Sequence, residues 1–467
     1  MEHQKRNSFS GSVGFVLAAA GSAVGLGNIW RFPYLAAKDG GGLFLVIYLI
    51  LALTFGFTLL VTEVAIGRKT KQSPLTAYAK LRPKWGFLGV VASLVPVIIL
   101  PYYCVIGGWV IRYFLAYLTG EGMQTAQEGY FTGFITSQAS PIVMLAIFLA
   151  VVSVVIILGV NKGIENFSKV LMPVLILLVL GIAVFSLTIS HTDADGVTRT
   201  GLQGFRIYVV PDLSGITLKG FFTVLVDAMG QLFFSLSVAM GIMVTYGSYV
   251  KDDANLVRSI NQIEIFDTLV AFLAGVMIIP AVFTFMGREG MEASGPSLMF
   301  VSLPRVFSAM GGIGNVIGCL FFAMVLFAAL TSAISVMEAV VSSLMDKFHW
   351  SRLKASLVEM VVALAAGIVV CLGYNIWYFE LKLPNGATAQ ILDVMDYLSN
   401  NLFMPLVAIG TCVLVGWLLK PKAVIDEVEK TGDKFGRRRL YVVMVKFVAP
   451  VLLVILFLKS VGLFTVI

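Results

Sequence analysis

The sequence predicts an all-α membrane protein whose first and sixth transmembrane helices are broken. Three observations lead to this prediction. Hydrophobic residues make up 58% of the 467 residues and charged residues only 13%, whereas soluble chains average about 45–50% apolar and about 25% charged residues. Eleven segments are long and apolar enough to cross a bilayer. Two of these segments, five spans apart, are interrupted by glycine and polar residues.

The predicted spans follow from the length of each apolar run, because a helix needs about 20 apolar residues to cross the hydrocarbon core. The eleven spans cover residues 13–37, 43–67, 87–118, 141–160, 167–189, 218–250, 260–286, 313–345, 355–375, 390–419 and 440–464.

Basic residues set the predicted orientation. They concentrate between spans 2 and 3 and between spans 10 and 11, whereas residues 119–140 contain no lysine or arginine. The positive-inside rule therefore predicts a cytoplasmic N-terminus. Because the number of spans is odd, the C-terminus is expected outside the cell, with the protein in the plasma (inner) membrane.

The first span contains Gly21, Gly25 and Gly27, followed by Asn28 and Arg31. Each glycine costs a helix about 0.5–1 kcal/mol relative to alanine. A broken membrane helix with polar groups is tolerated only where it lines a protein cavity. A GxxxG packing face formed by Gly21 and Gly25 is the alternative, but it leaves the amide and the guanidinium unexplained.

The sixth span places Gln231, Ser235 and Ser237 at mid-depth between Gly230 and Gly241. Interrupted segments at matching places in two halves of a chain point to a transporter's central binding site. Ordinary hydrogen bonding between helices by the serines is the alternative.

The spacing of the broken spans also predicts the domain organisation. Because they lie five spans apart, helices 1–5 and 6–10 run in opposite directions and are expected to form a 5+5 inverted repeat, with one extra helix. The predicted units are a cytoplasmic segment (1–12), the first repeat (13–189), an outside loop (190–217), the second repeat (218–419), a basic cytoplasmic loop (420–439), and the eleventh helix with a short C-terminus (440–467). The loop 190–217 is either a lid or a solvated linker.

Ionisable residues inside a membrane are costly and are therefore candidate functional groups. Asp267 lies on a helix face that turns toward the bundle interior, while Glu264, one turn nearer the cytoplasm, reaches water in the simplest interpretation. Glu63 is interpreted as a packing or network residue. Asp396, near the outer end of its span, is expected to face Arg31, either as a gate or as a surface ion pair of little energetic value.

Hydroxyl groups in two further spans are candidate ligands. Thr331 and Ser332 either bond back to their own helix or, with carbonyls freed from a broken helix, supply the oxygen ligands that a small hard cation requires. Sodium is the obvious ion in a transporter. Tyr103 brings a phenol to mid-membrane, where it meets either a core carbonyl or a substrate carboxylate.

The sequence argues against an enzyme. Its three histidines, His3, His191 and His349, are far apart, and no metal-ligand spacing or nucleophile motif is present. A sensor that binds a ligand without transporting it remains an alternative.

The motifs at 21–33, at the glycines 40–42, at 231–240 and at 330–332 together resemble those of the neurotransmitter:sodium symporter family. The bacterial amino-acid branch, typified by LeuT, is the most similar, and the resemblance covers spans 1 to 10. It implies the LeuT-like fold and two sodium sites. Sodium site one would comprise Ala23, Asn28, Ser235 and Asp267, and sodium site two Gly21, Val24, Ala328, Thr331 and Ser332.

The resemblance also implies a substrate site between the broken helices. The substrate's carboxylate would meet Tyr103, the first sodium ion and backbone amides, and its ammonium group would meet backbone carbonyls. The implied substrate-binding residues are Ala23, Gly25, Leu26, Gly27, Ile99, Tyr103, Phe234, Ser235, Ser237, Met240, Ser332 and Val336.

Two positions differ informatively from other members of the family. Gly25 stands where monoamine transporters carry aspartate, so the resemblance implies a substrate that brings its own carboxylate. Asp267 stands where many relatives carry asparagine, and its charge would replace the chloride that those relatives bind near positions matching Tyr48, Gln231 and Ser235. Chloride is therefore expected not to be required.

The resemblance further implies two gates. The outer gate would comprise Arg31, Asp396, Tyr103 and Phe234, and the inner gate Arg6, Phe9, Ser248, Tyr249 and Asp346. The expected function is sodium-coupled symport of a neutral hydrophobic or aromatic amino acid by alternating access. Selectivity for small aliphatic amino acids and a non-transporting amino-acid sensor are the alternatives.

Overall fold

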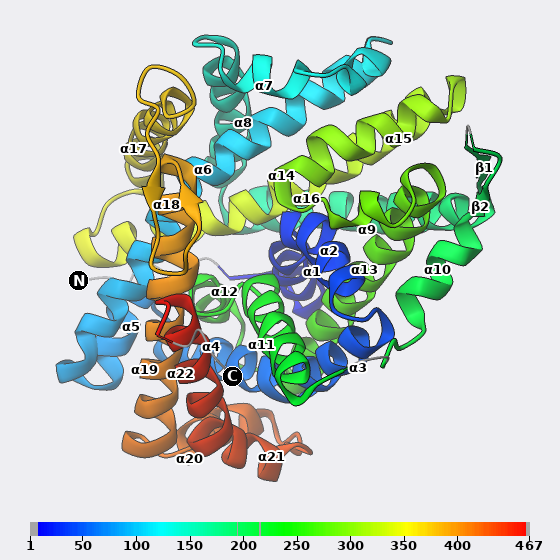
Figure 1. Cartoon of the computed structure of the whole chain (residues 1–467). Helices are drawn as coiled ribbons and strands as arrows, with labels where there is room; N and C mark the ends of the chain where they lie inside the picture. The colour runs from blue at the N-terminus through cyan, green and yellow to red at the C-terminus, as the bar shows by residue number, and fades with distance from the viewer. Residues whose placement is uncertain (1–7, 194, 214–215, 464–467) are drawn as a thin grey trace.

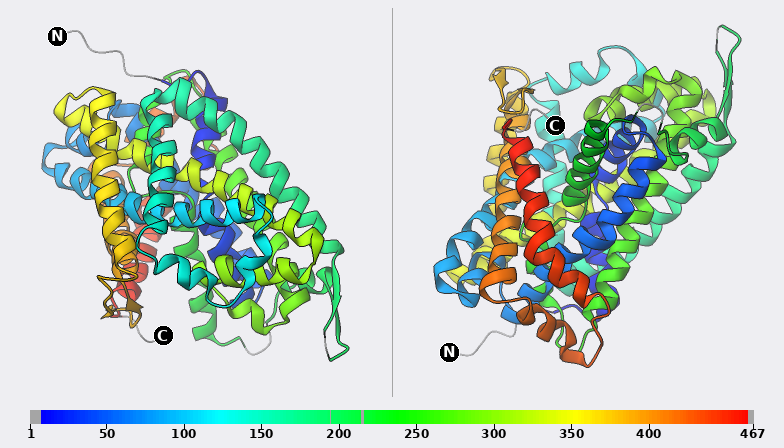
Figure 2. Two further views of the ribbon diagram at one scale, coloured as in Figure 1. Left: turned by 90° about the horizontal axis from the view of Figure 1, so that it is seen from above. Right: turned by 60° about the horizontal axis from the view of Figure 1, so that its bottom comes forward.

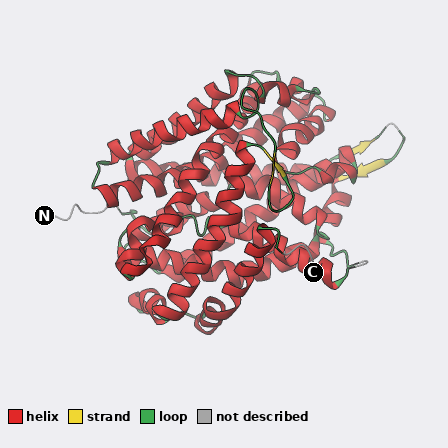
Figure 3. Ribbon diagram, turned by 60° about the vertical axis from the view of Figure 1, so that its left-hand side comes forward, coloured by secondary structure: helices red, strands yellow, loops and turns green. Residues whose placement is uncertain are grey.

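The structure is a computed structural model that describes residues 8–193, 195–213 and 216–463. Helices form nearly all of it (Figure 3). In the described residues, nine helical spans are long and apolar enough to cross a membrane without a break. They contain α3 (Gly42–Leu51) with α4 (Phe57–Thr70), α6 (Gly86–Leu118), α8 (Ser140–Ile157), α9 (Asn166–Thr188), α13 (Leu256–Met286), α16 (Gly312–Phe348), α17 (Arg352–Leu372), α18 (Ile391–Asp396) with α19 (Met404–Val413), and α21 (Arg438–Val443) with α22 (Ala449–Ser460).

Two further spans are broken, as the sequence predicts. Helix α1 (Ser12–Ala23) and the helical segment that ends with α2 (Phe32–Lys38) meet at an angle of 51°. Helices α11 (Leu218–Ser235) and α12 (Ile242–Tyr249) are separated by residues 236–241. All four lie in the middle of the bundle (Figure 1). The predicted fold class, an all-α membrane protein with breaks in its first and sixth spans, is confirmed.

The second break contains strained backbone. Ser237 and Ala239 have φ angles of 53° and 62°, in the left-handed region that side chains other than glycine rarely occupy. The carboxylate of Glu63, from α4, accepts a hydrogen bond from the Ala239 backbone amide at 2.6 Å. Such strain persists only where the surroundings hold it. Glu63 is therefore the network residue that the sequence suggested, and it stabilises the break.

The connectors contain the remaining elements. Residues 190–217 include a hairpin of β1 (Ser190–Thr192) and β2 (Thr198–Thr200), which projects from the bundle (Figure 2), and helix α10. Tyr208 of α10 is buried and donates a hydrogen bond to the Phe272 carbonyl of α13 at 3.0 Å. The α10 part of the loop is therefore packed on the bundle and is not a solvated linker. The other elements are α5 (Pro74–Leu81), α7 (Tyr130–Ile135), α10 (Gly201–Val209), α14 (Gly295–Ser297), α15 (Leu303–Ala309), α20 (Lys422–Val428), β3 (Leu381–Lys382) and β4 (Thr388–Ala389).

The basic loop 420–439 is folded against the bundle. Arg68 of α4 pairs with Glu427 at 2.7 Å, and Arg437 pairs with Glu264 at 3.0 Å. The expectation that Glu264 reaches water is wrong, because this side chain is buried and has an arginine partner. Outside the spans, the Lys71 ammonium holds the pKa of the Asp252 carboxyl below its usual range.

Glycines allow α4 and α12 to touch. A Cβ atom placed on Gly67 would lie 2.0 Å from the Val244 carbonyl oxygen, and one placed on Gly247 would lie 2.3 Å from the Val64 carbonyl oxygen. Small residues that let backbones approach are typical of membrane-helix interfaces. This contact fixes the half-helix α12 to α4.

We expect Gly67→Ala to lower the free energy of unfolding by about 1–3 kcal/mol, because the methyl group overpacks a backbone contact. The thermal midpoint of the purified protein in detergent measures this effect. Gly181→Ala is the matched control, because a Cβ at Gly181 of α9 meets nothing within 4 Å. Equal midpoints for the two variants would contradict the predicted close packing.

Candidate functional site

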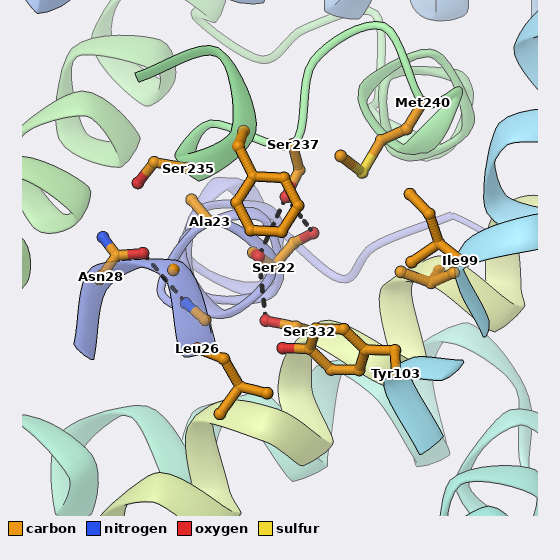
Figure 4. Close-up of a pocket in the computed structure, with 14 residues that line it drawn as sticks. Ser22, Ala23, Leu26, Asn28, Ile99, Tyr103, Ser235, Ser237, Met240 and Ser332 are labelled. Atoms are coloured by element: carbon orange, nitrogen blue, oxygen red, sulfur yellow. Dashed lines mark hydrogen bonds between the residues drawn. The ribbon is translucent and has the colours of Figure 1, made fainter. Parts of the chain in front are cut away.

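The two breaks enclose a cavity of about 380 Å³, which includes space open to solvent. Helix α6 contributes Ile99 and Tyr103, and α16 contributes Ser332 and Val336, opposite the broken segments (Figure 4). The lining residues are Ser22, Ala23, Gly25, Leu26, Gly27, Asn28, Ile99, Tyr103, Phe234, Ser235, Ser237, Met240, Ser332 and Val336. The structure thus brings all twelve predicted substrate-binding residues together and adds Ser22 and Asn28.

Asp267 lies beside this cavity and is fully buried. Its Oδ1 atom accepts hydrogen bonds from Asn28 Nδ2 at 2.8 Å and from Ser235 Oγ at 2.7 Å. Its Oδ2 atom accepts one from the Tyr48 hydroxyl at 3.3 Å. No lysine or arginine in the described part of the chain lies within 4.0 Å of this carboxylate. A buried carboxylate without a cationic partner is costly, so this arrangement of oxygens suits a cation.

The end of α1 leaves backbone carbonyls that side-chain hydroxyls can reach. The last regular helical bond here runs from the Val24 amide to the Ala20 carbonyl, at 2.8 Å. The Ser22 carbonyl accepts hydrogen bonds from the hydroxyls of Ser237, at 3.0 Å, and Ser332, at 3.1 Å. Hydroxyls from α16 and from the second break thus occupy positions around the carbonyls that the first break exposes.

Three predicted residues of sodium site two, Gly21, Thr331 and Ser332, lie close to one another. A Cβ on Gly21 would lie 3.2 Å from Thr331 Cβ, and Ser332 Oγ lies 3.4 Å from the Gly21 carbonyl oxygen. The Thr331 hydroxyl donates to its own helix, to the carbonyls of Phe327 at 3.0 Å and Ala328 at 3.1 Å. Each of the two interpretations applies to one of the hydroxyls. Thr331 donates to carbonyls of its own helix, whereas Ser332 donates to carbonyls of the broken helix α1.

Tyr103 and Gly25 define the polar end of the cavity. The Tyr103 hydroxyl is buried beside the Ser332 hydroxyl and the Leu26 backbone amide, but it makes no hydrogen bond of regular geometry with them. A Cβ on Gly25 would lie 3.3 Å from this hydroxyl and 2.8 Å from Ser332 Oγ. The cavity thus presents a phenol hydroxyl beside a position where any residue larger than glycine must displace a neighbouring atom. This hydroxyl can donate a hydrogen bond to a polar ligand in the cavity.

Of the four predicted outer-gate residues, Tyr103 and Phe234 line the cavity, whereas Arg31 and Asp396 do not. Asp396 accepts hydrogen bonds from Tyr102, at 3.1 Å, and from Asn400, at 2.6 Å. No ion pair within 4.0 Å joins Asp396 to Arg31, although both residues are described. The Arg31–Asp396 gate stays a prediction: the two side chains interact electrostatically without direct contact in this conformation, in which Tyr102 and Asn400 donate to the carboxylate. The sequence analysis assigned no role to Tyr102 or to Asn400.

Phe9, one of the predicted inner-gate residues, is buried against two tyrosine rings. This side chain is 1% exposed, and its ring lies 5.7 Å from that of Tyr246 and 6.1 Å from that of Tyr249. Its backbone amide donates to the Tyr249 carbonyl at 3.2 Å. Arg6, the other predicted inner-gate residue of this segment, lies outside the described residues. Of the remaining two, Ser248 is buried and bonds to its own helix, and Asp346 accepts from the Ser73 amide at 2.6 Å.

A charged cluster that sequence reasoning missed joins the last helix, α22, to α2 and α11. Asp227 of α11 accepts hydrogen bonds from Lys38 of α2 at 2.9 Å and from Lys459 of α22 at 2.8 Å. Burial raises the pKa of the adjacent Asp39 carboxyl, which lies outside the spans, to about 6. The three residues of the bridge are far apart in the sequence, and none belongs to a recognisable motif.

Comparison with known proteins is consistent with this architecture. The sequence pattern of the sodium:neurotransmitter symporter family matches residues 6–128 and 130–466. An uncharacterised sodium-dependent transporter of Bacillus subtilis is 33% identical, with 99% of each chain covered. The human sodium- and chloride-dependent GABA transporter 2 is 26% identical over 93% of this chain and 75% of its own. The crystal structure of MhsT in complex with L-phenylalanine matches with a TM-score of 0.84 and 33% identity, covering 97% of this chain and all of that one.

Proposed function

The chain belongs to the sodium:neurotransmitter symporter family and is a sodium-coupled transporter, and we propose that it carries a neutral hydrophobic or aromatic amino acid. The observation that carries this proposal is the cavity around Gly25. None of its fourteen lining residues is charged, so it offers no counter-ion to a charged side chain. The similarity to a transporter whose crystal structure contains L-phenylalanine supports the same class.

The polar end of the cavity supports recognition of the amino-acid backbone. The hydroxyl of Tyr103, which lines the cavity, is a donor for the substrate carboxylate. Backbone carbonyls at the ends of α1 and α11 are acceptors for the ammonium group, and helix ends present partial charges of suitable sign. Ile99, Met240 and Val336 would then surround the substrate side chain.

Two sodium sites are proposed on either side of the first break. Asp267, Asn28, Ser235 and the Ala23 carbonyl supply oxygens for the first. The carbonyls of Gly21, Val24 and Ala328, with the hydroxyls of Thr331 and Ser332, supply oxygens for the second. Mixed carbonyl, hydroxyl and carboxylate oxygens are the ligands that hard cations take.

Transport by alternating access follows from these assignments. Sodium binding next to both halves of the broken first span favours the state in which the cavity opens outward, because a ligand shifts populations only by its differential affinity. Substrate binding then brings Arg31 and Asp396 together. Loss of the second sodium ion releases α1 and with it Phe9, which opens the inner side. The proposed orientation has a cytoplasmic N-terminus and an outside C-terminus in the plasma (inner) membrane.

A counterflow screen with the twenty amino acids tests the substrate class. Proteoliposomes loaded with each amino acid in turn are given labelled phenylalanine in sodium medium. We expect exchange with aromatic and large aliphatic amino acids, and none with charged amino acids. Exchange limited to glycine or to charged amino acids would refute the proposed cavity chemistry. Sodium-dependent binding without exchange or accumulation would identify a sensor.

We expect transport to be unchanged when gluconate replaces chloride. Asp267 supplies a fixed negative charge beside Tyr48, Ser235 and Asn28, and a second anion there would be repelled at short range. Initial uptake rates in the two media, at equal sodium concentration, measure this. A strict chloride requirement contradicts the proposed role of Asp267.

A further inference from the structure

Helix α17 has a buried face that contains a carboxyl group. The buried residues follow a helical stripe facing α6 and α8, and Glu359 lies within it, 3% exposed. Close packing continues along the stripe, since a Cβ on Gly367 would lie 2.8 Å from a methyl carbon of Leu145. The residues of this face are Ala355, Ser356, Glu359, Ala363, Gly367, Val370 and Cys371. Glu359 therefore points into protein, not into lipid.

No charged group compensates Glu359. Its Oε1 atom is buried without a hydrogen-bond partner, and no lysine or arginine of the described chain lies within 4.0 Å. The titratable neighbour on α6 is the buried thiol of Cys104. Helix α8 carries no ionisable residue, and on α16 Glu338 is taken by Arg352, at 2.7 Å. An unpaired carboxylate in such surroundings is costly, whereas the neutral acid is tolerated.

Two more unpartnered polar atoms lie on the same face of α17. Arg352 Nε and Ser356 Oγ are buried and make no hydrogen bond within the described protein. Arg352, Ser356 and Glu359 are spaced at i, i+4 and i+7, which places them one above the other on a helix. At 1.5 Å per residue the row extends roughly 10 Å into the bundle. Buried polar atoms that lack protein partners typically hydrogen-bond to water.

The row begins on the inner side of the protein. Glu338, the partner of Arg352, also accepts a hydrogen bond from the Tyr249 hydroxyl at 2.6 Å. Tyr249 in turn contacts Phe9, one of the predicted inner-gate residues. The row of polar residues on α17 therefore starts near the N-terminal segment and ends at Glu359. Glu359 faces Cys104 of α6, which follows Tyr103 in the sequence.

We propose that Glu359 is a proton-binding site, separate from the sodium and substrate sites and reached from the inner side along Arg352 and Ser356. The neutral acid of Glu359 releases its proton to water on that side and becomes a carboxylate, and the reverse step restores the acid. Because the site lies in the scaffold behind the helix that carries Tyr103, the proposal does not depend on which substrate is transported.

Infrared spectroscopy of the purified protein in detergent tests the site without transport. We expect a protonated-carboxyl stretching band that is weaker in Glu359→Gln than in the wild-type protein, because the substitution removes the contribution of Glu359, and this contribution should respond to the pH of the medium. Glu264→Gln is the matched control, because Glu264 is equally buried but paired with Arg437. The Glu264 variant should retain the band. A Glu359→Gln spectrum identical to that of the wild type overturns the proposal.

The path is tested by hydrogen–deuterium exchange of the same band. Ser356→Ala should slow the isotope shift several-fold after transfer to heavy water, while Glu359→Asp should keep a titrating band and thus exclude misfolding as the cause of loss in the glutamine variant. An unchanged exchange rate in Ser356→Ala overturns the proposed path. Failure of substrate uptake would leave these readouts unaffected, so the proton site and the transport proposal fail separately.

Discussion

Replacing Asp267 by alanine is expected to abolish sodium-driven substrate accumulation. The carboxylate accepts hydrogen bonds from Asn28, Ser235 and Tyr48, and it is the one carboxylate among the proposed ligands of the first sodium ion. An interaction with a charged partner contributes about 1.5–3 kcal/mol, so its loss corresponds to roughly a 10- to 150-fold weaker sodium affinity. Because the same sodium ion would hold the substrate carboxylate, substrate affinity falls as well.

Sodium titrations of substrate binding to the purified protein measure this effect. Asp267→Asn separates charge from shape, since it keeps the side-chain volume and removes the charge. We expect the asparagine variant to bind weakly in gluconate and to recover part of its affinity in chloride, because a mobile anion can then supply the missing charge. Alanine and asparagine variants with wild-type sodium dependence would refute the assignment of the first sodium site.

Replacing Gly25 by aspartate is expected to prevent binding of amino acids. The new side chain would begin 2.8 Å from Ser332 Oγ and 3.3 Å from the Tyr103 hydroxyl, in the space proposed for the substrate carboxylate. Two like charges about 4 Å apart repel by about 4 kcal/mol at an effective dielectric constant of about 20. The affinity for phenylalanine should therefore fall by at least about 100-fold.

The charge effect is distinguished from the steric effect by Gly25→Asn and by a second ligand. Asparagine has nearly the volume of aspartate but is neutral. Phenylalanine and phenethylamine, which lacks the carboxylate, are compared in competition binding for both variants. We expect the ratio of the two affinities to shift toward phenethylamine in the aspartate variant and to shift less in the asparagine variant. Equal ratios would contradict a carboxylate subsite at Gly25.

Much of the site was predictable from the sequence because its polar residues stand out in apolar spans. Asp267, Thr331 and Ser332 are unusual in membrane helices, and glycines mark the first break. Helical periodicity also determines which residues lie on the same face of a helix. Asp267 could therefore be assigned to the bundle interior from its apolar neighbours, without knowledge of its partner Asn28, which lies 239 residues away. The resemblance to a family supplied the pairing of these residues.

Other features depend on side-chain directions that a sequence pattern does not encode. Glu264 and Arg437 are 173 residues apart, and only the folding of loop 420–439 onto the bundle brings them together. The Asp396 carboxylate accepts hydrogen bonds from Tyr102 and Asn400 in this conformation. The pattern of charges in the sequence predicts only Arg31 as its partner. The row at Arg352, Ser356 and Glu359 looks like ordinary helix sequence, and only its burial and its unpartnered atoms distinguish it.

Accumulation of labelled L-phenylalanine in proteoliposomes tests the central claim most directly. With an inward sodium gradient, the internal concentration of phenylalanine should rise above the external one and should fall back when a sodium ionophore removes the gradient. The same vesicles with an inward potassium gradient should only equilibrate. Accumulation that is equal in sodium and potassium, or binding of phenylalanine that never becomes accumulation, would contradict a sodium-coupled amino-acid symporter.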